Sequence, residues 1–540
     1  MKKHAAVIAF LFTAALAGAQ SMNDAYLFSQ NNYIGTARTV GMGNAVTAVG
    51  GDIGTLYFNP AGSAVNSYSQ FSVTPGLVIT SADAHGTPLS GQSEPYGFED
   101  PNITGHTRFA VPNYGFVMNF KTNRKSHGLK NWTFGFVGHT TNNFLNEVYA
   151  SGSNYNTSFA GCMAALADGT PSSVFGGDTP YDNTSWRPVA AYNSNMIATY
   201  GGMDDRYIGV TEKTDGDVIR LADGLNQRYG WLRTGSKQDL LFNFGFNISD
   251  VFYFGANIGI TSLSMNSDEY WAEEAMNPKK FAIQYVIGDG QFQETFFDNL
   301  RLRYSYNMEG NGAYLKAGFL TTPVAGLRIG AAITTPTVLN IREYYAYDAQ
   351  TRFLDSTFDG YSKSPEGEWE YDLRTPMRVN AGVAYTFGAI GLVSADYEMC
   401  NYGMMHFKSF MSRNDSEFEG VNADISDFMG VSHMLRVGTE IRPMPELAIR
   451  AGYNLTTNPE KDDYGKYIKS NRESASFGLG YSSKSSFFAD LGFRVNFLPD
   501  DYFLAYDDYA YDASGSSILS PEIVNKVTMF DVLLTLGLRF

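Results

Sequence analysis

Residues 529–540 of the chain read MFDVLLTLGLRF, and from Phe530 onward they alternate between two kinds of side chain. One set is large and apolar, whereas the other is small or polar, with Leu533 as its apolar exception. Period-two alternation predicts a β-strand with one apolar face, because successive side chains of a strand point to opposite sides. The apolar face of this predicted strand comprises Phe530, Val532, Leu534, Leu536, Leu538 and Phe540.

Other segments show the same alternation over about ten residues and are separated by polar turns. The clearest are FFADLGFRVNF at 487–497, VFYFGANIGIT at 251–261 and ELAIRAGYNL at 446–455. Such segments are typical of transmembrane β-barrels, and glycines on their polar faces indicate that something occupies the interior. About fifteen candidate strands can be counted, whereas bacterial barrels have an even number, so either one candidate is not a strand or one strand turns back at a kink. We expect an all-β, antiparallel transmembrane barrel.

The composition favours the same fold class. The chain contains 35 Tyr, 39 Phe and 55 Gly, and a barrel needs an apolar outer band flanked by aromatic side chains. An ordinary exported β-sandwich is the alternative, but its strands are shorter and less aromatic. The two cysteines, Cys162 and Cys400, exclude a disulfide framework, although their redox state stays open. The net charge of −16 argues against nucleic acid as a partner.

Residues 1–19 have the features of a secretory signal peptide. Two lysines near the start precede an apolar stretch from Ala5 to Ala17, and Ala17-Gly18-Ala19 provides an A-x-A-like cleavage site. The stretch is too short and wrongly flanked for a membrane anchor, and no cysteine follows it to carry a lipid. We therefore expect an exported protein whose mature chain begins at Gln20.

Two prolines interrupt the predicted strands. Pro112 and Pro376 lie inside alternating segments, where a proline removes a ladder hydrogen bond; each break could relieve strain or form an opening in the wall.

A long region at about 145–237 is expected to form a compact extracellular loop. In NSDEYWAEEA at 266–275, Asn266 precedes Glu269 by three residues, which predicts a short helix.

Residues 20–64 differ from the rest of the chain. They are small, glycine-rich and only weakly periodic, and they precede the first predicted strand. We expect them to fold as a hatch, or plug, inside a barrel formed by residues 65–540, because small residues permit close backbone packing. Asn59-Pro60 predicts a turn in this segment. A periplasmic tail is the alternative.

The segment VGMGNAVTAVGGDIGTLYFNPAG, which contains Asn59, Pro60 and Ala61, resembles the N-terminal hatch of the FadL/TodX-type outer-membrane transport proteins. LRIGAAITTPTVLNIREYYAY and YDLRTPMRVNAGVAYTFGAIGLVSADYE also resemble this family, particularly its Bacteroidetes-type members. The similarity covers the hatch and most strands, and is weakest at 145–237.

The resemblance implies a multi-pass antiparallel barrel of about 14 strands in a Gram-negative outer membrane, plugged by the hatch. It implies a channel for hydrophobic molecules, notably long-chain fatty acids or similar amphiphiles, which bind inside the barrel and leave sideways through a gap at a kinked strand. A gating role in the hatch then falls to Asn59, Pro60 and Ala61. Outer-membrane lipid and lipopolysaccharide are further expected partners.

The terminal strand resembles the signal by which the barrel-assembly machinery recognises its precursors. It must also pair with the first strand, because an open strand edge cannot persist in lipid. We therefore expect Phe530 to Phe540 both to close the barrel and to direct its assembly.

Catalytic and metal motifs are missing from the sequence. The seven histidines form no H-E-x-x-H or closely spaced pair, and no G-x-S-x-G occurs. We therefore expect no enzyme, no metal and no cofactor. Two functional alternatives stay open: a shuttle or scaffold barrel of a protein secretion system, and a porin for polar solutes, which the predicted hatch disfavours.

Overall fold

A computed structural model describes residues 20–540 except 88–95, 125–126, 183, 216–217, 287–290, 411–415, 485 and 512–514. The predicted signal peptide, residues 1–19, lies outside the described residues.

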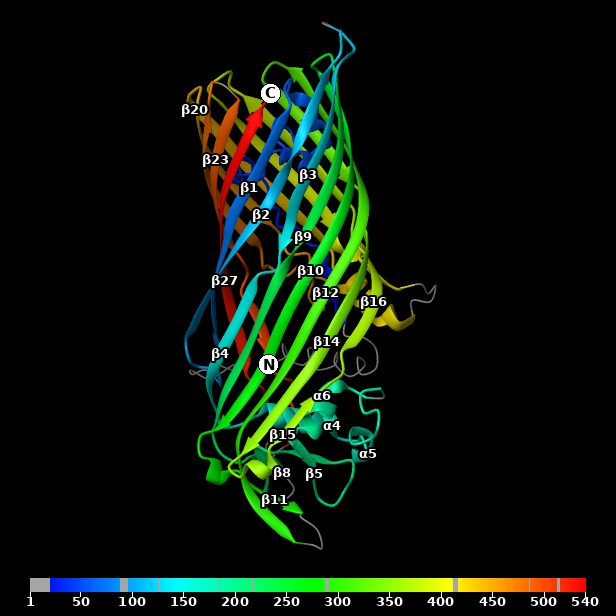
Figure 1. The fold of residues 1–540 in the computed structure, drawn as a ribbon, viewed down its shortest axis with the longest axis vertical. Helices are drawn as coiled ribbons and strands as arrows, with labels where there is room; N and C mark the ends of the chain where they lie inside the picture. The colour runs from blue at the N-terminus through cyan, green and yellow to red at the C-terminus, as the bar shows by residue number, and fades with distance from the viewer. Residues whose placement is uncertain are drawn as a thin grey trace.

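Fourteen antiparallel strands form a closed barrel, as predicted (Figure 1). The last strand pairs with the first, from Gln70↔Arg539 to Gly86↔Ile523. In order around the wall the strands are β1(Gln70–Gly86), β2(Asn102–Lys121), β3(Leu129–Asn143), β9(Leu225–Ile248), β10(Phe252–Ala275), β12(Phe292–Val324), β13(Leu327–Thr334), β17(Arg378–Thr386), β18(Gly391–Asn401), β20(Val431–Met444), β21(Leu447–Thr456), β22(Arg472–Ser482), β23(Phe487–Phe497) and β27(Glu522–Arg539).

Four of these strands are interrupted and continue in a second piece. β4(Asn146–Asn154) continues β3, β14(Val338–Phe353) continues β13, β16(Gly367–Arg374) precedes β17, and β19(His406–Ser409) follows β18. Shorter strands complete the sheet or form small hairpins: β11(Ala282–Val286), β15(Gly360–Lys363), β24(Asp501–Leu504), β25(Ala510–Tyr511) and β26(Ser517–Ile518).

The terminal strand has the orientation that its alternation predicts. Phe530, Leu534, Leu536 and Leu538 are exposed on the outer face, and the backbone of Phe540 exchanges two hydrogen bonds with Ser69, at 2.9 and 3.0 Å. Leu533, the apolar exception, points inward and is 1% exposed, in a cluster with hatch residues. Its side chain is apolar because it packs against the hatch.

An apolar belt surrounds one half of the barrel. Along β10 the outward side chains Phe252, Phe254, Ile258 and Ile260 are exposed, whereas the next positions of the same face, Ser262, Ser264, Asn266 and Asp268, are polar. A band of this kind is the lipid-facing surface of a transmembrane barrel. The protein is a multi-pass β-barrel of an outer membrane. No helix of the described residues is long and apolar enough to cross a membrane.

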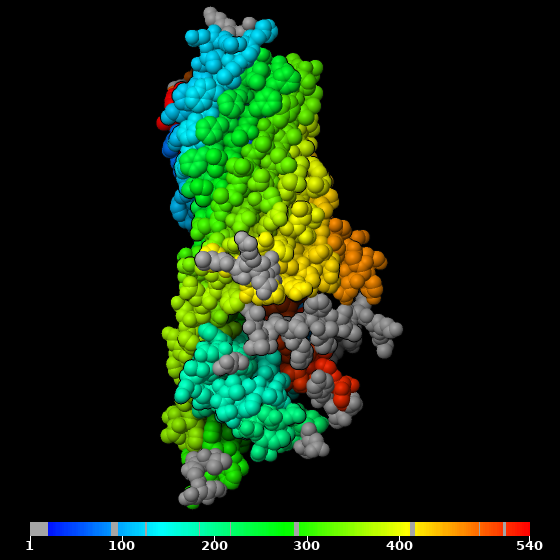
Figure 2. All heavy atoms as spheres, turned by 90° about the vertical axis from the view of Figure 1, so that its right-hand side faces the viewer, coloured from blue at the N-terminus to red at the C-terminus, as the bar shows by residue number. Residues whose placement is uncertain are grey.

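The two ends of the barrel differ. At the short-turn end, uppermost in Figure 1, tight turns such as the one at Asp250 join neighbouring strands. At the opposite, long-loop end, β9, β10 and β12 extend beyond the belt and carry a compact domain of residues 155–224, coloured teal in Figure 2. This domain contains α4(Phe159–Ala167), α5(Ser172–Phe175), α6(Trp186–Asn193), β5(Ile197–Thr199), β6(Tyr207–Gly209), β7(Glu212–Asp215) and β8(Val218–Leu221).

Two local expectations differ from the structure. The loop region expected at about 145–237 is shorter, because β4 and the start of β9 continue the wall through residues 146–154 and 225–237. The helix predicted at 266–275 is wrong, because β10 continues through Ala275. There it pairs with β9 on one side and β12 on the other, and this tertiary pairing overrides the local cap signal.

Residues 20–65 run inside the barrel (Figure 1). This segment, called the hatch below, contains α1(Met22–Ser29), α2(Ala37–Gly41), α3(Thr55–Phe58) and the 3-10 helix η1(Pro60–Val65); a further helix, α7(Glu419–Phe428), lies outside it. The wall approaches the hatch so closely that a Cβ on Gly255 would lie 2.3 Å from the carbonyl carbon of Pro60. A Cβ on Gly452 would lie 2.1 Å from the nitrogen of Gly43. Glycine is required at both wall positions for the hatch to fit.

Candidate functional site

The Asn59-Pro60-Ala61 motif lies where the hatch is bonded to the wall. The Asn59 amide donates to the carbonyls of Thr47, at 2.8 Å, and Phe319, at 2.9 Å, the latter in β12. Its oxygen accepts from the Ala61 amide at 3.1 Å, which caps η1. The Pro60 carbonyl accepts from Asn243 of β9 at 3.0 Å. The motif therefore joins two hatch segments to two wall strands.

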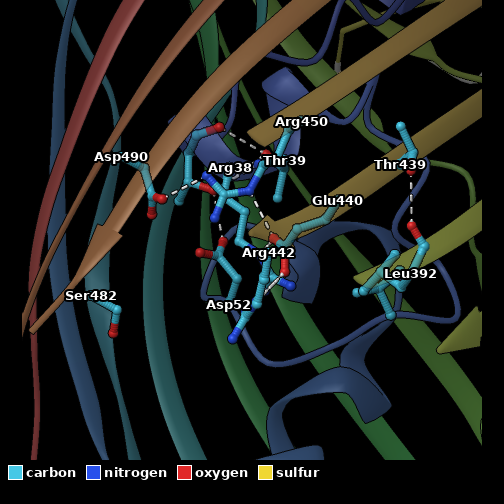
Figure 3. Close-up of polar contacts among 12 residues, drawn as sticks. Arg38, Thr39, Asp52, Leu392, Thr439, Glu440, Arg442, Arg450, Ser482 and Asp490 are labelled. Atoms are coloured by element: carbon cyan, nitrogen blue, oxygen red, sulfur yellow. Dashed lines mark hydrogen bonds and ion pairs between the residues drawn. The ribbon is translucent and has the colours of Figure 1, made fainter. Parts of the chain in front are cut away.

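A buried charge network forms a second attachment of the hatch (Figure 3). Arg38 of α2 lies 2.9 Å from Glu440 of β20, and the same carboxylate oxygen lies 2.7 Å from Arg450 of β21. Arg450 also contacts Asp490 of β23 at 2.6 Å. Arg442 lies 2.9 Å from the other oxygen of Glu440. The hatch cation Arg38 is thus tied, through Glu440, to a network of side chains from β20, β21 and β23.

A second network surrounds Glu398 of β18. Its carboxylate lies 3.0 Å from Arg378 and 3.1 Å from Arg436, and the Tyr33 hydroxyl of the hatch donates to it at 2.6 Å. Sequence reasoning did not find these sites. The sequence does place charged residues on the inward faces of predicted strands. Such residues are more simply interpreted as the lining of a solvated lumen than as contacts to a hatch.

An apolar section of the lumen lies on the long-loop side of these networks. Ala25 and Phe28 of α1 pack in it, so the helix fills part of the space. We call this section the apolar chamber. Its buried wall residues include Phe144, Leu263, Met265, Met308, Leu339, Ile341, Tyr371, Leu373 and Phe407.

Cations of the wall hold the C-terminal end of α1. Lys237 donates to the carbonyls of Phe28 and Gln30 at 3.0 and 2.7 Å, and Arg378 donates to that of Ser29 at 2.6 Å. Positive charge is favourable at the negative end of a helix. A small polar cavity of about 40 Å³, lined by Lys237, Asp239 and Arg378 among others, adjoins this contact. The apolar chamber therefore ends at two cations, Lys237 and Arg378, with Asp239 beside them and Glu398 3.0 Å from Arg378; we call this its cationic end.

Strand pairing is interrupted between β2 and β3. The two strands pair from Lys121↔Asn131 to Asn113↔His139, and the next residue of β2 toward its start, Pro112, cannot donate a hydrogen bond. From Ala110 to Asn102, β2 pairs with β1 but, among the described residues, with neither β3 nor β4. An isolated bridge between Asp100 and Ser151 closes the far side. We call this gap in pairing the wall opening.

Pro376, the other suspected break, does not open the wall. It lies between β16 and β17, beside Pro336 between β13 and β14. Here the Thr375 amide donates to the Thr337 carbonyl at 2.8 Å, and the Thr337 amide donates to the Thr375 hydroxyl at 3.0 Å. These bonds keep the two kinked strands together.

The hatch lies behind the wall opening. The amides of Asn32 and Ile34 donate to the carbonyls of Thr141 and Thr140, at 2.7 and 3.0 Å, so the hatch pairs with β3 where β2 has left it. Beyond this point the wall turns inward. Phe144 packs in the apolar chamber, and the next residue, Leu145, packs against the hatch.

No protein-family model and no curated protein matches this sequence. Solved structures resemble it over nearly its whole length. The toluene transporter TodX of Pseudomonas putida is 12% identical, with 94% of this chain and 99% of that chain covered and a TM-score of 0.45. A FadL homologue of Pseudomonas aeruginosa is 11% identical, with 94% and 98% covered and a TM-score of 0.48.

CymD, a monoaromatic hydrocarbon channel, is 10% identical, with 94% of this chain and 97% of that chain covered and a TM-score of 0.43. These structures are FadL- and TodX-type transporters. At such identities and TM-scores, the neighbours carry no information about the residues or the ligand of this chain. Within the described residues, no group of three or more His, Cys, Asp or Glu could hold a metal ion.

Proposed function

We propose that the protein is a channel for hydrophobic molecules, which bind in the apolar chamber and leave sideways through the wall opening. The observation that carries this proposal is the position of Phe144, which lies at the inward turn beside the opening and lines the chamber. An apolar solute has little reason to cross water, whereas a sideways exit returns it to a bilayer. The long-loop end would then face the outside.

The hatch is the proposed gate. It pairs with β3 behind the opening, and α1 fills part of the chamber, so a ligand can enter and leave only if the hatch shifts. Asn59, Pro60 and Ala61 are proposed to anchor this movement, because they bond the hatch to β9 and β12.

Long-chain fatty acids, or similar amphiphiles, are the proposed ligands. The apolar chamber would accept an acyl chain, and Lys237 and Arg378 at its cationic end would accept a carboxylate once the end of α1 has moved. Neutral hydrocarbons would occupy only the apolar chamber and would leave Lys237 and Arg378 without a ligand partner.

Binding is tested by native mass spectrometry of the detergent-purified protein, with identification of any released lipid. A bound fatty acid that excess oleate displaces would support the proposal. An empty barrel that takes up no oleate would contradict it, and co-purified secreted proteins would favour the shuttle alternative instead.

Exit is tested with two tryptophan variants of β2. Ala110 lies on the inward face of β2 beside the opening, and Val111 lies on the outward face, 39% exposed. We expect Ala110→Trp to slow delivery of fatty acid to the membrane about tenfold or more, which corresponds to about 1.4 kcal/mol, and Val111→Trp to leave it unchanged. Equal rates in both variants and the parent protein would exclude exit through this opening.

A further inference from the structure

One side chain of β2 reaches across the wall opening. Arg108 donates through Nη1 to the Gly235 carbonyl of β9, at 2.9 Å. Its neighbour Phe109 points the other way, toward lipid, and is 65% exposed. The guanidinium therefore joins the free edge of β2 to a strand beyond β3, over the path that connects the apolar chamber with the bilayer.

The Gly235 carbonyl is available because the wall is irregular at this point. Gly235 pairs with Met265 of β10, but residues 144 and 145 interrupt β3 and β4, so Gly235 has no ladder partner on that side. Its carbonyl accepts a 3.2 Å bond from the Phe144 amide there. Gly235 has a φ of +125°, and a Cβ on it would lie 2.1 Å from the Ser264 carbonyl oxygen. Its position is thus set by the backbone and does not depend on Arg108.

A ligand that leaves the chamber past Phe144 must displace the bond between Arg108 and Gly235. A neutral hydrocarbon offers no acceptor, so its passage leaves the guanidinium unpaired in an apolar setting, which is costly. A carboxylate replaces the carbonyl with a stronger, charge-assisted acceptor. His106 of β2 also faces the opening, and its Nε2 lies 4.0 Å from the Glu147 carboxylate of β4.

We propose that Arg108 is a specificity-determining residue of the exit, which favours ligands with an anionic head group over neutral hydrocarbons of equal chain length. This inference rests on the proposed function, since it concerns passage through the same opening. Removal of Arg108 should speed the exit of hydrocarbons and have little effect on carboxylates.

The test compares release of palmitate and of hexadecane from the loaded protein in nanodiscs to acceptor liposomes. We expect the parent protein to release palmitate faster. In Arg108→Met, which keeps an unbranched apolar stem but lacks the donor, hexadecane release should rise about tenfold, while palmitate stays within about twofold. Arg108→Lys should behave like the parent. Arg228→Ala, which removes an equally charged but exposed side chain of β9, is the matched control.

Unchanged hexadecane release in Arg108→Met would overturn the inference, as would equal acceleration of both ligands. This failure is distinct from that of the proposed function. If Ala110→Trp still blocks release, the exit route stands without a role for Arg108, whereas if Ala110→Trp has no effect, the route itself is excluded.

Discussion

Arg38 of the hatch lies 2.9 Å from Glu440 of β20, in an ion pair whose carboxylate is 2% exposed. A buried pair of this kind adds little net stability, but loss of one partner leaves an uncompensated charge, which costs about 3–5 kcal/mol. The Glu440 carboxylate forms ion pairs with Arg38, Arg442 and Arg450. We therefore expect the Glu440 carboxylate to hold the hatch against β20 and β21.

Glu440→Gln should loosen the hatch while keeping the shape of the side chain. We expect a lower free energy of unfolding in urea and more frequent current openings in planar bilayers, because Arg38 and Arg450 lose their shared anion. Arg442→Gln is the control, since that side chain is 44% exposed. If the two variants behave alike, the network does not hold the hatch.

Asn59→Ala removes three hydrogen bonds at the motif predicted from the sequence. The carbonyls of Thr47 and Phe319 lose their donor inside a packed interior, so we expect a destabilisation of about 1–3 kcal/mol. We also expect altered uptake of fatty acid, measured with a labelled ligand in whole cells. Asn156→Ala, at an exposed position, should change neither. Normal uptake by a destabilised Asn59→Ala would show that the motif is structural and does not gate.

The domain of residues 155–224 should lose stability as the pH rises. Burial raises the pKa of Glu212 in β7 to about 7, although the Gly209 amide donates to it at 2.9 Å and Tyr509 bonds it; nearby Asp168 adds to the rise. Because the folded pKa lies above the unfolded value, this contribution is complete below about pH 4.5 and is lost as the pH rises through 7. Protection factors for hydrogen exchange in α4, which correct each rate for the faster intrinsic exchange at high pH, should therefore be lower at pH 8 than at pH 5.

Glu212→Gln should remove most of this pH dependence, because the amide cannot ionise. Asp215→Asn, at an exposed position of the same strand, should leave it intact. Equal protection factors of the parent domain at the two pH values would show that Glu212 does not control its stability.

Phe540→Ala separates closure of the barrel from recognition by the assembly machinery. Phe540 is 69% exposed, and its bonds to Ser69 come from the backbone, so the variant should refold normally in detergent. We expect several-fold less assembled protein in the outer membrane of cells, whereas Phe530→Ala, on the same face, should assemble normally. Equal yields would mean that the last ring is not part of the signal.

The alternating strands and the closed barrel were predictable from the sequence, because period-two patterning is local and one face of every strand must meet lipid. Phe530 to Phe540 and the strands at 251–261 and 487–497 show this directly. The small residues of the hatch and the glycines facing it also carry a local signal, since close backbone approach tolerates little else.

Only the tertiary structure decided where strand pairing ends and which distant groups meet. Pro112 and Pro376 look alike in sequence, yet one borders the wall opening and the other lies in a wall held by Thr337 and Thr375. The helix signal at Asn266 yields to pairing on both sides of β10. The contact between Arg38 and Glu440 joins residues about four hundred positions apart. Such outcomes depend on strand register and on burial, which are properties of the assembled barrel and not of any local segment.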